Sequence, residues 1–417
     1  MSDGRAALPA KGRSWDQLKS EMEALAANDF DWRGSRLGVY VFNAGEDVRE
    51  VAKDAYSMFI AENGLGPAAF PSLRRMEDDV VGFGLSLLGA PEDGCGDMTS
   101  GGTESILMAV KACRDWWRAQ GNETKTEIVT PYSAHPAFNK AAEYLGLTVK
   151  RVPVAPDFTA DVDAMAAAIS PNTMMIVGSA PCFPFGVIDE IERLSSLALE
   201  HKLWLHVDAC VGGYFAPFAR LNGVNLPPFD FALPGVRSMS ADLHKYGYAA
   251  KGASTVFYRS ADLREHQLFR FGEWPTGEMA TPTLAGTRPG GAIAAAWAVM
   301  RYLGQEGYQE KTRIVIETRE KYERGLEEIG GFRLWGRHQL GLLAFGSDEF
   351  DMFAVAEGMR DRGWMSANLR EPKGMHLMLS PAHSEVADQY LSDMADTVAE
   401  VRAGKRVAVA GGGSRYS

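Results

Sequence analysis

The stretch TMMIVGSAPCFPFGVIDEIERLSSLALEHKLWLHVDA, residues 173–209, contains two short apolar runs with a helical pattern between them. Residues 173–181 and 203–209 have the composition of buried strands, and residues 188–201 carry apolar side chains at intervals of three and four. A strand, a helix and a second strand in this order usually form a parallel pair with the helix packed against it. The stretch therefore predicts an α/β fold with a mostly parallel sheet.

The same alternation continues on both sides, from about Thr126 to Arg259. Further runs typical of strands are TEIVT (126–130), TVKRVPV (148–154), RSMSADLH (237–244) and ASTVFYR (253–259). Further helical patterns are HPAFNKAAEYLG (135–146) and DVDAMAAAI (161–169). We expect the strands to form one sheet with helices on both faces.

We divide the chain into an arm (residues 1–55), a large domain (56–291) and a smaller α+β C-terminal domain (292–417). The last part is predicted from its pattern, and its final residues GGGSRYS are expected to fray. Its expected elements are helices over 292–307 and 308–330, a strand pair at LGLLAFGS (340–347) and MHLMLS (375–380), and a helix over Ser384–Arg402.

Composition excludes several classes of protein. The net charge of −11 argues against nucleic acid or an anionic membrane surface as partner. Four cysteines without a CxxC pair suggest neither a zinc site nor a disulfide framework, and they favour a reducing, cytoplasmic setting. We find no signal peptide and no transmembrane segment, since no run of eighteen apolar residues occurs.

Three motifs carry candidate chemistry. In TSGGTESILMAVKACRDWW (99–117), two glycines and three hydroxyl side chains precede a helix, which is the form of a phosphate cradle, although a plain turn has the same form. Asp208 ends an apolar strand. It either is a buried charge, which requires a cation or hydrogen-bond donors, or caps the following helix. In SADLHKYGY (240–248), Lys245 is either a surface lysine or a desolvated nucleophile with a lowered pKa.

Together these motifs match the requirements of pyridoxal 5′-phosphate. The cradle would anchor the cofactor phosphate, Asp208 would keep the pyridine nitrogen protonated, and Lys245 would hold the aldehyde as an imine. We therefore expect this cofactor and assign Lys245 as its lysine.

The chain resembles the sphingosine-1-phosphate lyases, a branch of the fold-type I, group II decarboxylase-like pyridoxal-phosphate enzymes. The resemblance extends from about Leu37 to Pro289, with weaker similarity beyond. Its segments are TSGGTESILMAVKACRD, AHPAFNKAAEYLG, GSAPxxPxGVID, HVDACVGGY, SADLHKYGYAAKGAS and TPTLAGTRPGG. The resemblance implies a fold-type I, transferase-like large domain that binds pyridoxal phosphate.

The resemblance also implies roles for individual residues. Lys245 would bind the cofactor covalently, Asp208 would pair with the pyridine nitrogen, and His135 would stack on the ring. Gly102, Thr103 and His244 would contact the cofactor phosphate. Thr287 would reach the cofactor phosphate of a partner chain, which implies a homodimer.

For the substrate, the resemblance implies a phosphorylated long-chain base whose phosphate meets Tyr40, His135 and Lys251. The implied reaction is a retro-aldol cleavage to a long-chain aldehyde and phosphoethanolamine. Lys245, or a nearby histidine or tyrosine, would be the base, and the preferred chain length stays open. Arg288 would serve either the cofactor loop or a surface ion pair.

Three positions depart from the lyase pattern. Gly66 stands where a histidine is usual, and Cys182 and Phe185 replace a glutamine and a histidine. We expect these changes to leave cofactor binding intact and to affect the choice of substrate.

Other functions remain open from the sequence. An amino-acid decarboxylase of the same fold would need an arginine for the substrate carboxylate, and Arg333, Arg337 and Arg370 are candidates. A homologue that has lost catalysis and serves as a binding subunit is a second alternative, although the Asp208–Lys245 pair argues against it. A nucleotide-binding protein is disfavoured because neither GxGxxG nor GxxxxGK[ST] is present.

Overall fold

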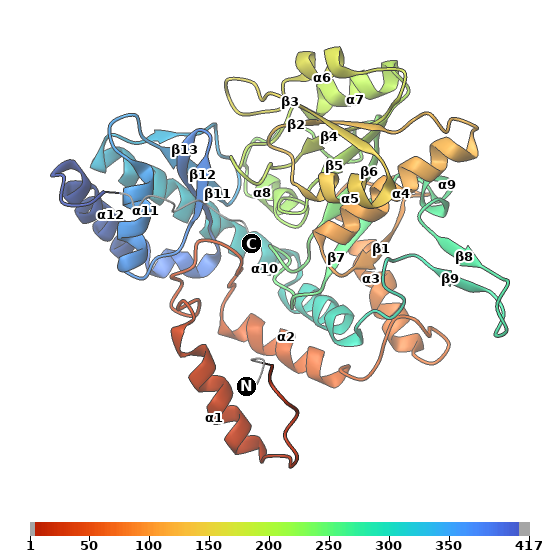
Figure 1. Ribbon diagram of the computed structural model, residues 1–417, viewed down its shortest axis with the longest axis horizontal. Coiled ribbons are helices and arrows are strands. Elements are labelled where there is room, and N and C mark those ends of the chain that lie inside the picture. The colour runs from red at the N-terminus through yellow and green to blue at the C-terminus, as the bar shows by residue number, and fades with distance from the viewer. Residues whose placement is uncertain (1–4, 408–417) are drawn as a thin grey trace.

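The computed structural model describes residues 5–407, and a seven-stranded sheet forms its centre (Figure 1). The strand order is β1-β7-β6-β5-β4-β2-β3. β7 runs antiparallel to both neighbours, and the other pairs are parallel. The strands are β1 (Cys95–Thr99), β2 (Glu127–Pro131), β3 (Thr148–Val152), β4 (Thr173–Ser179), β5 (Trp204–Asp208), β6 (Val236–Ala241) and β7 (Ser254–Tyr258). The predicted α/β fold with a mostly parallel sheet is confirmed.

The register of the central strands places polar residues side by side at the ends of the strands. β4 and β5 are buried along their whole length, as their apolar sequences predict. Ser179 lies opposite Asp208, and Asp208 lies opposite Ser240. The carboxyl ends of β4, β5 and β6 therefore meet at one edge of the sheet, which is where parallel sheets bind ligands.

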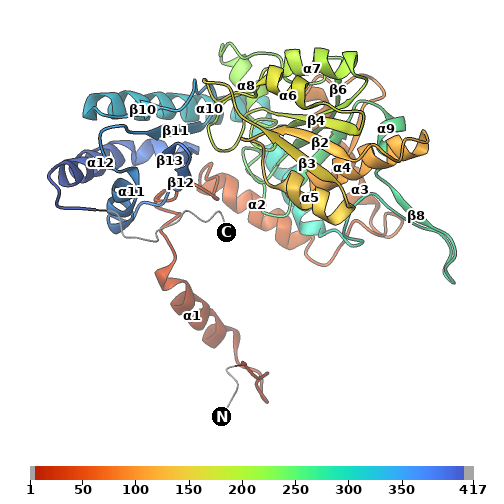
Figure 2. The ribbon, with the colours of Figure 1, turned by 45° about the horizontal axis from the view of Figure 1, so that its top comes forward.

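Helices cover both faces of the sheet, as expected. α4 (Gly102–Ala119) and α5 (Ala137–Leu145) lie on one face, and α6 (Val162–Ala168) and α7 (Ile191–Glu200) lie on the other (Figure 2). Around them lie the remaining helices of this part, α3 (Pro71–Leu87), α8 (Ala216–Leu221) and α9 (Ala261–Glu265).

The C-terminal part is a four-stranded antiparallel sheet with helices. Its strands, in the order β10-β11-β13-β12, are β10 (Arg333–Leu334), β11 (Leu342–Gly346), β12 (Ala367–Arg370) and β13 (Lys373–Met378). The predicted strand pair is confirmed as β11 and β13. The helices are α11 (Met352–Asp361) and α12 (Ala387–Arg402), with a 3-10 turn over Pro381–Glu385 at the start of the last predicted helix. The division into three parts stays a prediction, and residues 411–417 lie outside the described residues.

One long helical run joins the two parts. α10 (Gly290–Ile329) covers both predicted helices, but the break between them lies at Gly304, where φ is 56°, and not at the predicted boundary between residues 307 and 308. Glycine adopts this left-handed conformation without the steric cost that other residues meet, so the run changes direction there. α10 packs against α2 (Glu46–Met58), which brings the N-terminal arm onto the body of the protein.

Two segments project from the body in both views. α1 (Trp15–Leu25), followed by a 3-10 turn (Ala26–Asn28), has no buried residue, although Ser14 and Gln17 form a capping box at its start. The hairpin of β8 (Phe269–Phe271) and β9 (Met279–Thr281) extends from another side of the body, at the right of both views. Within residues 5–407, no helix is both long and apolar enough to cross a membrane.

Candidate active site

A cavity of about 370 Å³ lies at the carboxyl ends of β1, β4, β5 and β6. Six of the predicted site residues line it: Gly102, Thr103, His135, Asp208, His244 and Lys245. Within the described part of the chain, its lining does not include Tyr40, Lys251 or Thr287. The structure thus brings together the residues predicted to meet the cofactor, including His135, which is also predicted to meet the substrate phosphate, and it leaves Tyr40, Lys251 and Thr287 outside this lining.

The start of α4 forms one wall of the cavity. A Cβ at Gly102 would lie 2.7 Å from Cys210 Sγ and 2.8 Å from Asp242 Oδ2, so a side chain there would collide with both. Glycine instead leaves the backbone at the helix N-terminus accessible from the cavity. This is the form that a phosphate group requires, and it fits the phosphate of pyridoxal 5′-phosphate.

Glu104, which sequence reasoning missed, ties this wall to another segment. Its Oε2 accepts hydrogen bonds from the Ser100 backbone N and Ser100 Oγ, both at 2.6 Å. Its Oε1 accepts from the Leu284 backbone N at 2.8 Å, in the segment that carries Thr287. A glutamate in the first turn of a helix looks solvated in a sequence, and only the fold shows that it is buried.

Asp208 is fixed at the end of β5. Its Oδ1 accepts from the Cys210 backbone N at 3.1 Å and from Ser240 Oγ at 3.3 Å. The first bond closes a turn directly after the strand, and the next helix begins only at Ala216, so Asp208 does not cap it. The carboxylate is buried in the cavity lining, where it can meet the ring nitrogen of the cofactor.

Lys245 is paired with a second carboxylate, Asp242. The distance from Lys245 Nζ to Asp242 Oδ2 is 2.9 Å, and their side chains are 20% and 2% exposed. Burial acts to lower the pKa of Lys245, but the negative charge of Asp242 and, to a lesser degree, that of Asp208 outweigh it, so the pKa is raised. The expectation of a lysine with a lowered pKa is therefore wrong for this chain, because Asp242 lies beside it.

Two histidines of the cavity are neutral near pH 7. Burial lowers the pKa of His135, partly offset by the negative charge of Asp208, and burial likewise lowers the pKa of His244. His135 Nδ1 accepts from the Ala137 backbone N at 3.1 Å, which leaves the proton of the neutral ring on Nε2. His244 Nδ1 is buried and has no hydrogen-bond partner within residues 5–407. The neutral ring of His135 and the unpaired Nδ1 of His244 both fit an aromatic, phosphorylated ligand.

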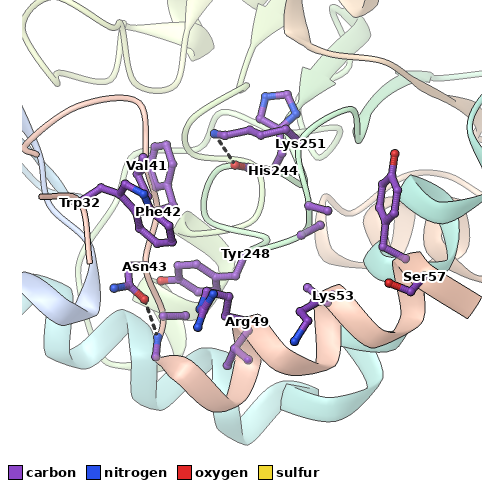
Figure 3. Close-up of a pocket in the computed structure, with 17 residues that line it drawn as sticks. Trp32, Val41, Phe42, Asn43, Arg49, Lys53, Ser57, His244, Tyr248 and Lys251 are labelled. Carbon is purple, nitrogen blue, oxygen red and sulfur yellow. Dashed lines mark hydrogen bonds between the residues drawn. The ribbon is translucent and has the colours of Figure 1, made fainter. Parts of the chain in front are cut away.

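Lys251 faces a second cavity, of about 390 Å³ (Figure 3). Lys251 Nζ donates to the backbone oxygens of Tyr40 at 2.8 Å and His244 at 3.2 Å. Helix α2 forms the opposite wall, with Arg49, Lys53 and Ser57. His244 lines both cavities.

The three residues predicted to bind substrate phosphate therefore do not share one lining. His135 belongs to the first cavity and Lys251 to the second. Tyr40, which is 41% exposed, meets Lys251 through its carbonyl oxygen, and its φ of 65° turns the chain at this point.

Thr287 and Arg288 follow the projecting hairpin. Thr287 is exposed, whereas Arg288 is buried and forms an ion pair with Glu77. Arg288 also donates to the Gly64 backbone oxygen at 3.2 Å. Of the two alternatives left open for Arg288, the surface ion pair is wrong, because α3 supplies a buried partner.

We expect Arg288→Ala to lower the free energy of unfolding by about 3–5 kcal/mol, because Glu77 would remain buried without its cation. Urea unfolding followed by circular dichroism measures this change. The matched control is Arg74→Ala, which breaks an exposed ion pair with Asp78 in α3, the helix that carries Glu77. It should lower the free energy of unfolding by about 0–1 kcal/mol. Equal losses in the two variants would contradict a structural role for the Arg288–Glu77 pair.

Two of the departures from the lyase pattern lie outside the cavity lining. Cys182 and Phe185 belong to a buried cluster with Val187, Trp335 and Ala344. Phe183, between them in sequence, is the residue that lines the cavity. In the described part of the chain, the replacements at 182 and 185 change the packing toward the C-terminal sheet rather than the cavity wall. Gly66 lies in the loop before α3 and has space for a Cβ beside it, with only Ala69 nearby.

The arginines that a decarboxylase would need lie elsewhere. Arg333 pairs with Asp348 at 2.6 Å, and Arg337 and Arg370 are exposed residues of the C-terminal part. Among the described residues that line the two cavities, none of the three is present.

Comparisons with known proteins identify the family of this chain. Residues 3–347 match the model of the pyridoxal-dependent decarboxylase conserved domain. The chain is 43% identical to a sphingosine-1-phosphate lyase of Oryza sativa over 96% of its length and 75% of that protein. It is 40% identical to sphingosine-1-phosphate lyase 1 of Mus musculus, over 98% and 72%. A solved sphingosine-1-phosphate lyase of Burkholderia pseudomallei superimposes with a TM-score of 0.92 at 36% identity, covering 96% of this chain and 94% of that one.

Proposed function

This chain belongs to the pyridoxal-dependent decarboxylase family and, within it, to the sphingosine-1-phosphate lyases, and on that premise we propose what it does. It is a pyridoxal-phosphate-dependent carbon–carbon lyase that cleaves sphingosine 1-phosphate to a long-chain aldehyde and phosphoethanolamine. The observation that carries the proposal is one cavity that holds Gly102, His135, Asp208 and Lys245 in a chain so similar to these lyases.

The chain offers a residue for each part of the cofactor. Lys245 would bind its aldehyde, Asp208 would face its ring nitrogen, and His135 would lie against its ring. Gly102, Thr103 and His244 would surround its phosphate, since all three line the cavity at the start of α4 or beside it. When bound, pyridoxal phosphate supplies an electron sink for the electron pair of the bond that breaks.

The residues around the reacting bond have separate tasks. The Lys245 amine is the proposed acceptor of the proton from the substrate C3 hydroxyl. Asp242, 2.9 Å away, stabilises the ammonium that forms. His135 cannot easily serve as this base, because its Nδ1 already accepts from the backbone and its Nε2 carries the proton. Nε2 of His135 is instead a donor that can orient an oxygen of the substrate.

Lys251 is the proposed partner of the substrate phosphate. It is a compact positive charge in the loop that also carries Lys245, at the border between the two cavities. Tyr40, through the carbonyl oxygen that Lys251 contacts, and His135, from the first cavity, are the other proposed contacts.

We expect the KM for the phosphorylated substrate to rise with pH in an interval that begins near pH 8. Burial, with a contribution from Lys245, lowers the pKa of Lys251 to about 8, so its charge is present below this value and is lost above it. Lys251 is surrounded by protein near its nitrogen, which donates to two backbone oxygens, but the residue as a whole is exposed, so water weakens the effect of burial and moves the loss of charge toward higher pH. The measurement is a pH profile of KM and kcat for wild type and Lys251→Ala.

In Lys251→Ala, KM should be higher by about 10-fold at pH 7 and should lose the pH-dependent rise, with kcat changed less. Lys53→Ala is the control, since Lys53 lies on the far wall of the same cavity and pairs with Glu50. An identical KM profile in wild type and Lys251→Ala would contradict the proposed contact.

A homodimer in the cytoplasm completes the proposal. Phe269, Phe271 and Trp274 of the projecting hairpin are about half exposed, and a second copy of the chain would cover such apolar surface. Thr287, exposed just beyond this hairpin, would then reach the cofactor phosphate of the partner. The four cysteines are all thiols and three are buried, in keeping with a reducing compartment.

A substrate panel separates the lyase from a decarboxylase. The loaded enzyme should consume sphingosine 1-phosphate and should release no CO₂ from L-tyrosine, L-aspartate or L-glutamate. The position of Arg333, Arg337 and Arg370 away from both cavities supports this result. Release of CO₂ from any of these amino acids at a higher kcat/KM than the lyase reaction would favour the decarboxylase instead.

A further inference from the structure

Asp242 is the buried charge nearest to the reactive nitrogen of Lys245. Its Oδ2 lies 2.9 Å from Lys245 Nζ and 3.7 Å from His244 Nε2. The residue comes directly after β6, and a turn that returns the Lys245 backbone N to the Asp242 backbone oxygen, at 3.3 Å, places the two side chains on the same side. The pair is thus built into the loop rather than formed by chance between flexible side chains.

A chain of hydroxyl groups holds the other side of this carboxylate. Ser254 Oγ donates to Asp242 Oδ1, and Ser105 Oγ lies 2.8 Å from Ser254 Oγ. Ser105 is in turn 2.6 Å from Thr99 Oγ1. These residues belong to β7, α4 and β1, so the position of Asp242 is fixed by two strands of the large sheet and one helix packed on it. A carboxylate held in this way cannot turn toward water when Lys245 loses its charge. Its negative charge therefore stays beside the nitrogen.

Among the described residues, the other carboxylates of the cavity are held by partners of their own, and Asp242 is the one that forms an ion pair with this nitrogen. Asp208 is bonded to the Cys210 backbone N and Ser240, and Glu104 is bonded to Ser100 and Leu284. Burial raises the pKa of the Cys210 thiol and lowers the pKa of His135 and His244, so these three are neutral near pH 7. Lys251, a nearby cation, donates to backbone oxygens of Tyr40 and His244.

We propose that Asp242 sets the protonation of the Lys245 nitrogen, both when the lysine is free and when this nitrogen is bonded to the cofactor. Asp242 is a positioning residue that acts through Lys245, and the inference rests on the proposed role of Lys245 as the cofactor lysine. A fixed anion beside a buried nitrogen stabilises the protonated form of that nitrogen by electrostatic attraction. The amide of an asparagine would keep the shape and remove this attraction.

The test is a pH titration of the visible absorbance of the holoenzyme, which reports the proton on the cofactor-bound nitrogen and needs no substrate. In wild type, the protonated form should persist to at least about pH 9. In Asp242→Asn, the midpoint should fall by about one to three pH units. Asp242→Glu, which keeps the charge, should restore most of the difference.

Glu104→Gln is the matched control, since it neutralises another carboxylate of the same cavity without touching Lys245. Its midpoint should stay within about 0.3 units of wild type. A midpoint in Asp242→Asn that equals that of wild type would overturn the inference. If Asp242→Asn does not fold or load the cofactor, the wild-type curve decides, and a midpoint below about pH 9 overturns the inference.

The same experiment separates this inference from the function on which it rests. A wild-type protein without any visible cofactor band counts against Lys245 as the cofactor lysine. A normal band that is insensitive to residue 242 counts against Asp242 alone.

Discussion

Replacing Lys245 by alanine is expected to reduce product formation by about 10³- to 10⁴-fold or more, because the variant loses both the covalent attachment and a proton acceptor. The variant leaves the buried Asp242 without its cation, which should lower the free energy of unfolding, although Asp242 keeps its bond to Ser254, and circular dichroism checks that the variant is folded. Borohydride reduction of the loaded protein, followed by peptide mass spectrometry, measures the attachment directly. Wild type should carry the cofactor mass on the peptide that contains Lys245, and the variant should carry none there.

Lys140→Ala serves as the control for this experiment. Lys140 is an exposed lysine on α5, close in sequence to His135, and its loss should alter neither the labelled peptide nor the rate. Labelling of a lysine other than Lys245 in wild type would contradict the assignment, as would undiminished turnover in Lys245→Ala.

Replacing Asp208 by asparagine is expected to lower kcat by about 10²- to 10³-fold, the usual cost of removing one preorganised electrostatic contact from a buried site. Asparagine can still accept from the Cys210 backbone N and Ser240 Oγ, so the turn after β5 should keep its shape. What it lacks is the negative charge that would keep a ring nitrogen protonated. Single-turnover and steady-state rates, compared with the wild-type rates, measure the loss.

Asp208→Glu is the companion variant because it keeps the charge and displaces it by one methylene. It should recover part of the rate lost in Asp208→Asn. If Asp208→Asn keeps a kcat within tenfold of wild type while it binds the cofactor stoichiometrically, Asp208 does not have the proposed role.

The central sheet could be predicted from the sequence because local patterns define most of its strands. β2 to β7 are apolar or β-branched runs, with helices between all of them except β6 and β7, and each was expected. β1, CGDMT, was missed because its sequence has a glycine and an aspartate and only one large apolar residue. It is a strand because β7 pairs with it and because Arg264 and Gln267 bind the buried Asp97. These partners lie more than 150 residues away in sequence.

The site was predictable where a motif lies at a strand end, and not where it depends on the direction of a side chain. Gly102, Asp208 and Lys245 meet in one cavity because the sheet aligns the strand ends that precede them. Asp242 was overlooked although it stands three residues before Lys245, because a loop sequence does not tell which way its side chains point. The burial of Arg288 depends on Glu77, which is 211 residues away.

The most direct test of the account is a product analysis with sphingosine 1-phosphate. Purified protein loaded with pyridoxal phosphate is incubated with the substrate, and mass spectrometry quantifies both products, with Lys245→Ala as the blank. The account predicts long-chain aldehyde and phosphoethanolamine in equal amounts from wild type alone. A protein that shows the visible cofactor band and forms neither product would contradict the lyase assignment.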